Sequence, residues 1–229
     1  MAHRPENHSH NPEDARIAEL AGAYADALIA GDEIAAEIAI REAMDAELPT
    51  AAIDEKVIAP ALWLIGELWE QGQISIAEEH IATEITVRVL ALQHEARRVA
   101  RERAAHRVML ATPPGELHVV ALRMVENLVR GAGYDVVMLG PDVPASTLAG
   151  AARHHRADVL CLSSTMPGHR DDLLAIIDEV RLEWPGAAFV LGGRGLTVED
   201  QMRPQVQFCH GVADAGDAVD ALIQRAGLN

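Results

Sequence analysis

The chain has 229 residues and carries 35 Asp and Glu against 19 Lys and Arg, for a formal net charge of −16. This acidic balance argues against direct binding of nucleic acid, because proteins that bind nucleic acid usually present a basic face. Apolar runs are too short to cross a membrane, and the first residues do not resemble a secretory signal. The two cysteines, Cys161 and Cys209, are too few for a disulfide scaffold. We therefore expect a cytoplasmic protein with buried thiols.

Helical patterns fill the first half of the chain. Residues 1–12 are polar and predict a disordered tail, and residues 13–104 are expected to form one helical domain. Apolar side chains recur at helical spacing over about 12–30, 33–48, 52–71 and 75–103. In the last segment, the expected inner stripe is Ile81, Ile85, Val89 and Leu92. Short connections between the helices imply an antiparallel four-helix bundle.

The pattern changes near residue 104, where strands begin to alternate with helices. Strand-like runs lie at 107–111, 135–139, 158–162, 187–191 and 206–209. The helical stretches between and after them lie at about 117–131, 144–155, 170–183, 197–203 and 215–226. This alternation predicts a doubly wound parallel sheet. Residues 105–229 are therefore expected to form a Rossmann-like domain around a five-stranded sheet.

Three loops at the carboxyl ends of these strands carry unusual residues. They are Pro113 to His118, with a Pro-Pro-Gly break before the histidine; Ser163 to Gly168; and Gly192-Gly193-Arg194-Gly195. Ligands of open α/β sheets bind at this edge, and a neutral imidazole there can coordinate a metal. Each loop alone is also explained by a turn, a helix cap or a structural histidine. Together they predict a ligand site with His118 as the metal ligand.

These residues resemble the motifs of the cobalamin-binding domain family. Its members carry an Asp/Glu-x-His-x-x-Gly loop, a Ser-x-Leu/Thr segment and a Gly-Gly pair at successive strand ends. The matches are Glu116-x-His118, Ser163-x-Thr165 and Gly192-Gly193, over about residues 106–226, and Ala121 stands where the family has glycine.

The resemblance implies a role for each matching residue. His118 would be the lower axial ligand of cobalt, and Glu116 would hydrogen-bond near it and fix its tautomer. Leu117 and Val119, which flank His118, would contact the cofactor. The displaced dimethylbenzimidazole tail would run beside Ser163, Thr165, Gly192 and Gly193.

A second group of residues lies at one end of the expected bundle. The connection at Gly72–Ile74 folds two helices together, which gathers Trp69, Glu79 and His80 at that end. His80 shares a helix face with Ile76, which predicts that it points inward. Alone, this group is equally consistent with a bundle end closed by the tryptophan and a Glu–His hydrogen bond.

The spacing Trp69-x(9)-Glu79-His80 resembles the cap of light-sensing adenosylcobalamin photoreceptors of the CarH/LitR type, and the resemblance then covers about residues 13–226. It implies that Trp69 lies over the upper face of the corrin and that Glu79 and His80 contact the adenosyl group. Ile76 falls at an aliphatic position of that cap. Light would break the Co–C bond, and the tryptophan end of the bundle would move.

The same resemblance shapes our expectation of partners. Only about a dozen residues precede the bundle, so we expect a sensor without the DNA-binding domain of these receptors. Such a protein would act through a homo-oligomer, a transcriptional regulator or another signalling partner. We expect it to bind neither nucleic acid nor membranes, and not to be an enzyme.

Alternatives remain open. A bundle joined to one cobalamin domain also resembles short cobalamin-binding antirepressors, and photocobilins, which add a bilin such as biliverdin. A bilin would be noncovalent, with His169, Arg170 and Arg194 as candidate contacts. The enzyme-class alternative is a corrinoid protein of a methyltransferase system, and a plain cobalamin carrier is a third. The Trp69 and Glu79-His80 group favours the sensor, because a methyl group needs no ribose-binding carboxylate.

Overall fold

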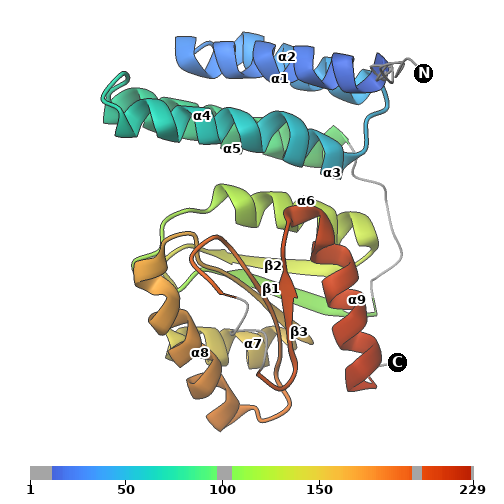
Figure 1. Ribbon diagram of the computed structural model, residues 1–229. Coiled ribbons are helices and arrows are strands. Elements are labelled where there is room, and N and C mark those ends of the chain that lie inside the picture. Colours follow the sequence, from blue (N-terminus) through green and yellow to red (C-terminus); the bar gives the residue numbers. More distant parts are fainter. Residues whose placement is uncertain (1–11, 97–104, 198–202, 228–229) are drawn as a thin grey trace, which may run out of the picture. The chain divides into compact units, whose positions relative to one another are not determined.

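The chain divides into two compact units, Met1–Val89 and Leu90–Asn229. This computed structural model describes residues 12–96, 105–197 and 203–227 (Figure 1). The predicted tail falls outside these ranges except for Pro12, where the first helix begins. The predicted domain boundary near residue 104 also falls outside them. Within the described ranges, no helix is both long enough and apolar enough to span a membrane.

From Pro12 onward, where its description begins, the first unit contains four helical runs, as the sequence predicts. They are α1 (Pro12–Ala30), α2 (Glu33–Asp45), the run of α3 (Thr50–Ile53), η1 (Asp54–Ile58) and α4 (Ala59–Glu70), and α5 (Ile76–Ala96), which continues past the unit boundary. Two ends carry the side-chain caps that their sequences offer. Asp32 caps α2 by accepting from the amide of Ala35, and Ser75 and Glu78 form a reciprocal capping box before α5.

The third run differs from the uniform helix predicted over 52–71. Its η1 turn is π-helical, with α-helix on both sides. Asp54, at the start of this turn, is fully buried. Single π turns inside α-helices often mark functional positions.

The core of the helical unit contains a buried hydrogen bond between Tyr24 and Thr86. Tyr24 is fully buried, and its hydroxyl donates to Oγ1 of Thr86 at 3.0 Å. Thr86 in turn donates to the carbonyl of Ala82. The buried stripe of α5 therefore includes Thr86 together with Ala82, Ile85 and Val89. The prediction that Ile81 belongs to this stripe is wrong, because the inward turn of Thr86 leaves Ile81 exposed.

The second unit is built on a parallel sheet in the order β2-β1-β3-β4-β5. The strands are β1 (Arg107–Ala111), β2 (Asp135–Gly140), β3 (Val159–Ser163), β4 (Ala188–Gly192) and β5 (Val206–Cys209). The chain moves outward in one direction from β1 to β2 and in the other direction from β3 onward. The switch point between β1 and β3 is where an open sheet of this kind binds its ligand.

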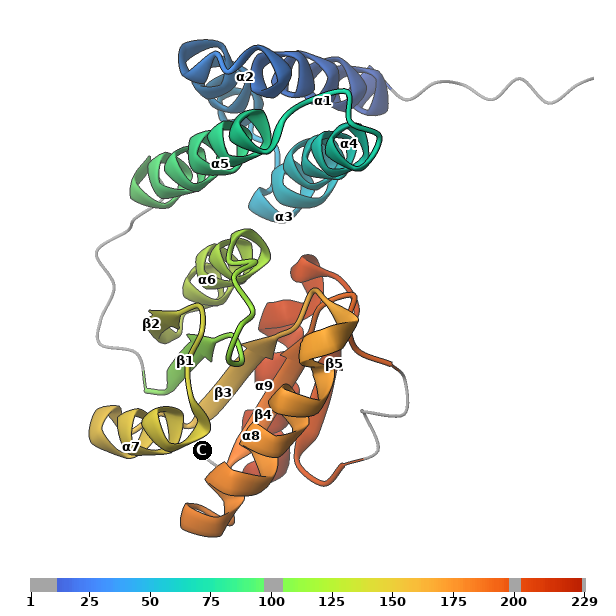
Figure 2. The same cartoon turned by 90° about the vertical axis from the view of Figure 1, so that its left-hand side faces the viewer.

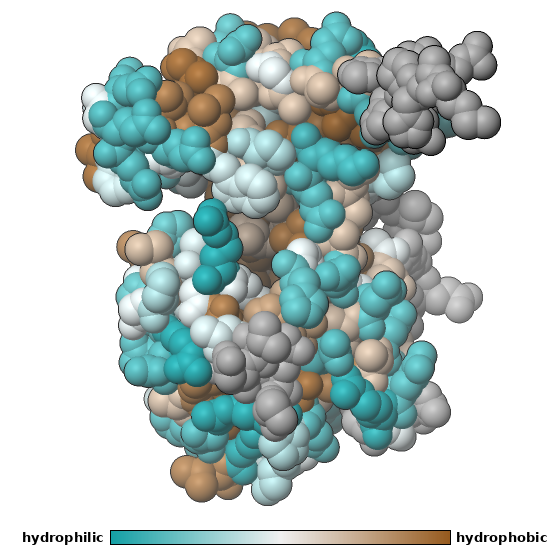
Figure 3. Space-filling model, viewed as in Figure 1, coloured by the Kyte–Doolittle hydropathy of each residue, from teal (hydrophilic) through white to brown (hydrophobic). Residues whose placement is uncertain are grey.

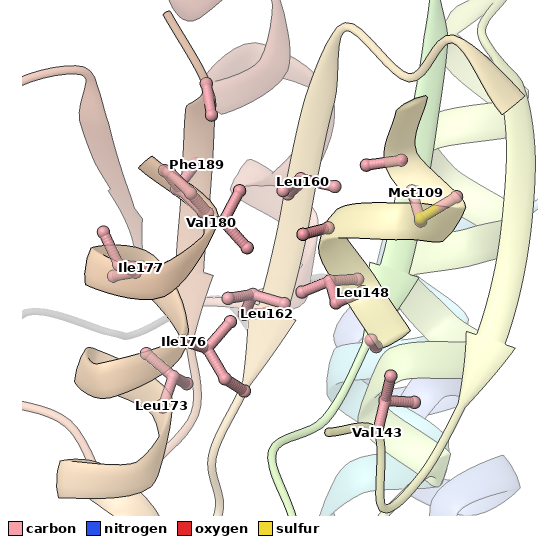
Figure 4. Packing of buried hydrophobic residues seen from close by; sticks show 14 of the residues in the cluster. Met109, Val143, Leu148, Leu160, Leu162, Leu173, Ile176, Ile177, Val180 and Phe189 are labelled. Atoms are coloured by element: carbon pink, nitrogen blue, oxygen red, sulfur yellow. The ribbon is translucent and has the colours of Figure 1, made fainter. Parts of the chain in front are cut away.

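Helices cover both faces of the sheet, which explains the nearly continuous apolar strands. They are α6 (Val120–Ala132), α7 (Ala145–His155), α8 (Arg170–Glu183) and α9 (Ala215–Ala226), with short 3₁₀ turns η2 (Pro167–His169) and η4 (Val212–Asp214). On one face, Leu148 of α7 and Ile176 of α8 pack against Leu160 and Leu162 of β3 (Figure 4). On the other, Val129 of α6 and Leu222 of α9 join the cluster that holds Cys161 and Cys209.

The doubly wound Rossmann-like architecture predicted from the sequence is thus confirmed. Both cysteines are buried and free, as expected. The predicted helix at 197–203 lies almost wholly outside the described residues.

Replacement of Tyr24 by Phe should lower the free energy of unfolding by about 1 kcal/mol, because it removes one buried hydrogen bond and leaves the ring in place. Urea unfolding followed by circular dichroism measures this loss. Arg16→Ala, which removes exposed ion pairs on the same helix, is the control and should have a smaller effect. Equal losses in the two variants would contradict the assigned role of Tyr24.

Candidate functional site

The three loops singled out in the sequence meet at the switch point of the sheet. Ala111, the last residue of β1, pairs with Leu162 of β3, and Ser163 pairs with Gly192 of β4. The His118 loop (residues 112–119), the β3 loop (residues 164–169) and the β4 loop (residues 193–197) therefore leave adjacent strands. This placement confirms that they share one edge.

A single carboxylate joins two of these loops. The side chain of Glu116 is fully buried although it belongs to a loop. Its Oε2 accepts hydrogen bonds from the amides of Thr165 at 2.8 Å and Met166 at 3.0 Å. Its Oε1 lies 2.5 Å from Nδ1 of His118 and also accepts from the amide of His118 at 3.1 Å. Glu116 is therefore the shared anchor of the His118 loop and the β3 loop.

These hydrogen bonds determine the charge of Glu116. Burial alone would raise the pKa of its carboxyl. The hydrogen bonds from the Met166 amide, the His118 side chain, the His118 amide and the Thr165 amide together outweigh burial. The pKa of Glu116 consequently lies below its ordinary value, and the group is a buried carboxylate at neutral pH.

The bond to Glu116 leaves one nitrogen of His118 for a ligand. When Nδ1 donates to the carboxylate, Nε2 carries the free lone pair. The side chain of His118 is 57% exposed, so a ligand can reach it. One oriented imidazole is the protein donor that a metal held in a macrocycle requires, because the macrocycle supplies its other ligands. The arrangement therefore fits the cobalt of a corrin.

The residues beside His118 differ in their surroundings. Leu117 is exposed, while Val119 is half-buried and directly precedes α6, without a capping hydrogen bond from its side chain. Ala121, which replaces the glycine of the motif, lies in the first turn of α6. Its φ is not positive, so the backbone does not require glycine here. The substitution costs no backbone strain.

Two glycines of the β4 loop lie close to the backbone of the β3 loop. A Cβ on Gly193 would lie 2.2 Å from the carbonyl oxygen of Ser164, and one on Gly195 would lie 2.6 Å from that of Met166. Gly193 also has a φ of 108°, which disfavours other residues. These glycines let the β4 loop pack against the β3 loop. Gly192 lacks these short contacts, since a Cβ there would lie 3.6 Å from Cys209.

The residues of the β3 loop differ in burial and in their contacts. Ser163 is buried at the end of β3, and Thr165 is half-buried with its amide bonded to Glu116. His169, a candidate bilin contact, packs against Gly115, where an added Cβ would lie 2.9 Å from its ring. Arg170, a second candidate, pairs with Asp171.

Sequence reasoning missed the residues that hold the His118 loop from its other side. Thr112 is fully buried, and its hydroxyl donates to the carbonyl of Glu116 at 2.5 Å. Asp142, in the β2–α7 loop (residues 141–144), accepts from the amide of Gly115. The Gly140-Pro141-Asp142 sequence after a strand is a turn signal that marks this loop, but it does not show what the loop contacts.

In the helical unit, the second predicted group lies at the end where α4 meets α5 (Figure 2). Trp69 is 46% exposed and Ile76 is also exposed. Glu79 is only 29% exposed, because its carboxylate accepts from Oγ1 of Thr83 at 3.0 Å and lies 2.5 Å from Nδ1 of His80. Apolar side chains are visible at this end of the unit in Figure 3.

The prediction that His80 points inward is wrong, since its side chain is 70% exposed. It lies two residues from buried Ala82, or about 200° around a helix that turns ~100° per residue. His80 therefore presents its ring to the surface beside Glu79. The group is an exposed apolar surface with one oriented carboxylate.

Comparison with known proteins gives the family of both units. One family model described as B12 binding domain matches residues 106–223, and a second with the same description matches residues 20–92. The repressor CarH of Myxococcus xanthus is 32% identical over 154 residues, which are 66% of this chain and 50% of that protein. Trimethylamine corrinoid protein 1 of Methanosarcina mazei is 28% identical over 138 residues, 59% of this chain and 63% of that one.

The chain thus spans only half the length of CarH and less than two thirds of the corrinoid protein. Among solved structures, the monomethylamine corrinoid protein of Methanosarcina barkeri aligns with a TM-score of 0.71 at 18% identity. The alignment covers 88% of this chain and 97% of that one, and it confirms the fold.

Gly193→Ala should lower the free energy of unfolding by about 2–4 kcal/mol, because the added Cβ meets the Ser164 carbonyl and the backbone conformation is strained. Gly168→Ala, in the adjacent loop with open space around it, is the matched control and should change stability little. Thermal and urea unfolding measure both. Similar stabilities would show that the two loops do not pack as described.

Glu116→Gln should lower the free energy of unfolding by about 1–3 kcal/mol at neutral pH. The NH₂ group of the glutamine would face N–H donors that the carboxylate of Glu116 now accepts from. Because the folded pKa of Glu116 is lowered, its stabilisation is complete above about pH 5, where an unfolded Glu is ionised, and is lost as the pH falls through the folded pKa. The stability difference between wild type and variant should therefore narrow on acidification. A stability difference that does not vary with pH would refute the conclusion that Glu116 stabilises the fold as a carboxylate.

Proposed function

This chain belongs to the B12-binding domain family, and we propose that within this family it is a light sensor that uses adenosylcobalamin. Its B12-binding domains imply a cobalamin cofactor. Cobalamin binding is supported by the nitrogen of His118 that faces away from buried Glu116 at the switch point of the sheet. The observation that carries the sensing role is the Glu79 carboxylate, which Thr83 orients close in sequence to exposed Ile76. The similarity to CarH supports the sensing role.

His118 would hold cobalt from the sheet domain. Glu116 keeps the proton on Nδ1, so that Nε2 presents its lone pair, and its negative charge makes the imidazole a stronger donor. Thr165 and Met166 keep the carboxylate in place through their amides. The imidazole therefore needs little reorganisation when it binds a metal.

The helical unit would supply the groups that recognise the adenosyl moiety. Trp69 offers an exposed aromatic face, and Ile76 extends this apolar surface. Glu79, oriented by Thr83, could accept hydrogen bonds from ribose hydroxyls. When bound, adenosylcobalamin supplies a cobalt–carbon bond that light breaks. Loss of the adenosyl group would remove its contacts with Trp69 and Glu79 and shift the conformation of the helical unit.

A corrinoid protein of a methyltransferase system is the second candidate. The similarity to the trimethylamine corrinoid protein supports it, and the same His118 arrangement would serve it. The Glu79 carboxylate favours the sensor, because a methyl group offers no hydroxyl to hydrogen-bond. The sensor would signal through a homo-oligomer or a partner such as a transcriptional regulator, without catalysis of its own.

The test is illumination of the purified protein loaded with adenosylcobalamin in the dark. Light should change the absorption spectrum and the oligomeric state or partner binding measured by size-exclusion chromatography. Trp69→Ala should reduce the change in assembly, while Trp63→Ala, an exposed tryptophan on the same helix, should leave it intact. An extra long-wavelength band in protein as isolated from cells would identify a bilin.

Two results would count against the sensor. Assembly that is the same in dark and light would remove the signalling role. Methyl transfer to or from the protein by a partner methyltransferase, without a response to light, would establish the corrinoid alternative.

A further inference from the structure

The His118 loop is fastened to the β2–α7 loop by a series of hydrogen bonds. The amide of Thr112 donates to the carbonyl of Gly140 at 3.1 Å, and the amide of Val143 donates to the carbonyl of Thr112 at 3.1 Å. Asp142 lies between Gly140 and Val143 and makes the contacts closest to Glu116. Nothing in the cobalamin motif includes this residue.

Asp142 bonds to the His118 loop with both its backbone and its side chain. Its Oδ1 accepts from the amide of Gly115 at 2.8 Å. Its own amide lies 3.1 Å from Oγ1 of Thr112 and 3.3 Å from the carbonyl oxygen of Glu116. Asp142 thus holds this segment at the N–H of Gly115 and at the C=O of Glu116. The side chain of the same Glu116 orients His118.

The backbone of Asp142 supports a functional reason for this arrangement. Its φ is 57°, in the left-handed region that disfavours residues with a Cβ. Asp and Asn tolerate this region better than most residues because their side chains bond to nearby backbone. Asp142 is exposed, so core packing does not force the conformation. Its bonds to the His118 loop are the contacts that offset this cost.

We infer that Asp142 is a positioning residue for the metal ligand, acting through Gly115 and Glu116 on His118. This inference rests on the proposed binding of cobalamin through His118. Gly115 has a φ of 77° and the freedom of a glycine, so without Asp142 the segment before Glu116 would sample more conformations. The loop would then lose that freedom at the moment of binding, which weakens affinity.

Three substitutions separate the side chain from the backbone. Asp142→Asn keeps an oxygen acceptor and tolerates the left-handed conformation. Asp142→Gly keeps the conformation but loses the acceptor, and Asp142→Ala loses both. Asp217→Ala removes an exposed carboxylate of the same domain and controls for charge.

The experiment is titration of each full-length apo-protein with hydroxocobalamin, with affinity and absorption spectrum read together and the apo melting temperature measured in parallel. Asp142→Gly and Asp142→Ala should bind about threefold to tenfold more weakly, the value of one net hydrogen bond, with a smaller fraction of the histidine-ligated spectrum. Asp142→Asn and Asp217→Ala should bind within about twofold of wild type.

Two outcomes overturn the inference in distinguishable ways. If His118→Ala matches wild type in spectrum and affinity, the proposed function is wrong and the role of Asp142 falls with it. If wild type shows histidine ligation but Asp142→Gly keeps its affinity and spectrum, only the inference is wrong. If Asp142→Gly lowers the melting temperature of the apo-protein but leaves the histidine-ligated spectrum and the affinity unchanged, Asp142 has only a structural role.

Discussion

One buried carboxylate organises the edge of the sheet where we expect the ligand site. Glu116 accepts four hydrogen bonds, two from the β3 loop and two from His118. These bonds outweigh the cost of burial, and they keep the group ionised. The Glu116 side chain both joins the two loops and orients the imidazole of His118. The packing of the loops and the orientation of the imidazole therefore depend on each other. A change that separates the loops would also alter the orientation of the His118 ring.

The neighbouring loops hold the backbone segments that contact this carboxylate. Gly193 and Gly195 lack side chains where the β4 loop packs against the β3 loop. The β4 loop therefore lies in close contact with the backbone that donates to Glu116. Thr112 and Asp142 hold the other side of the His118 loop. Rigid support of this kind places the imidazole before a ligand arrives. The helical unit provides a contrasting surface, in which Trp69 and His80 are exposed while Glu79 is held by Thr83 and His80.

The sequence predicted the architecture well, because alternation of strands and helices depends on local patterns of apolar residues. It also predicted that His118 and Ser163 would share an edge, since parallel strands end together. The family resemblance also implied the contact between Glu116 and His118. The sequence did not predict that the amides of Thr165 and Met166 would bond to Glu116, because they belong to a distant loop and amides carry no sequence signature. The rotation of α5 depends on contacts with other helices: Thr86 is buried and bonded to Tyr24, while Ile81 and His80 are exposed.

The most direct test of this account asks which nitrogen binds the metal. Protein labelled with ¹⁵N-histidine and loaded with cobalamin can be reduced to the paramagnetic cobalt(II) state and examined by electron paramagnetic resonance. If His118 is the axial ligand, each cobalt line should be split into a doublet by ¹⁵N, and the doublet should disappear in His118→Ala. A triplet in the labelled protein, arising from the ¹⁴N of the cofactor's own base, would contradict the account.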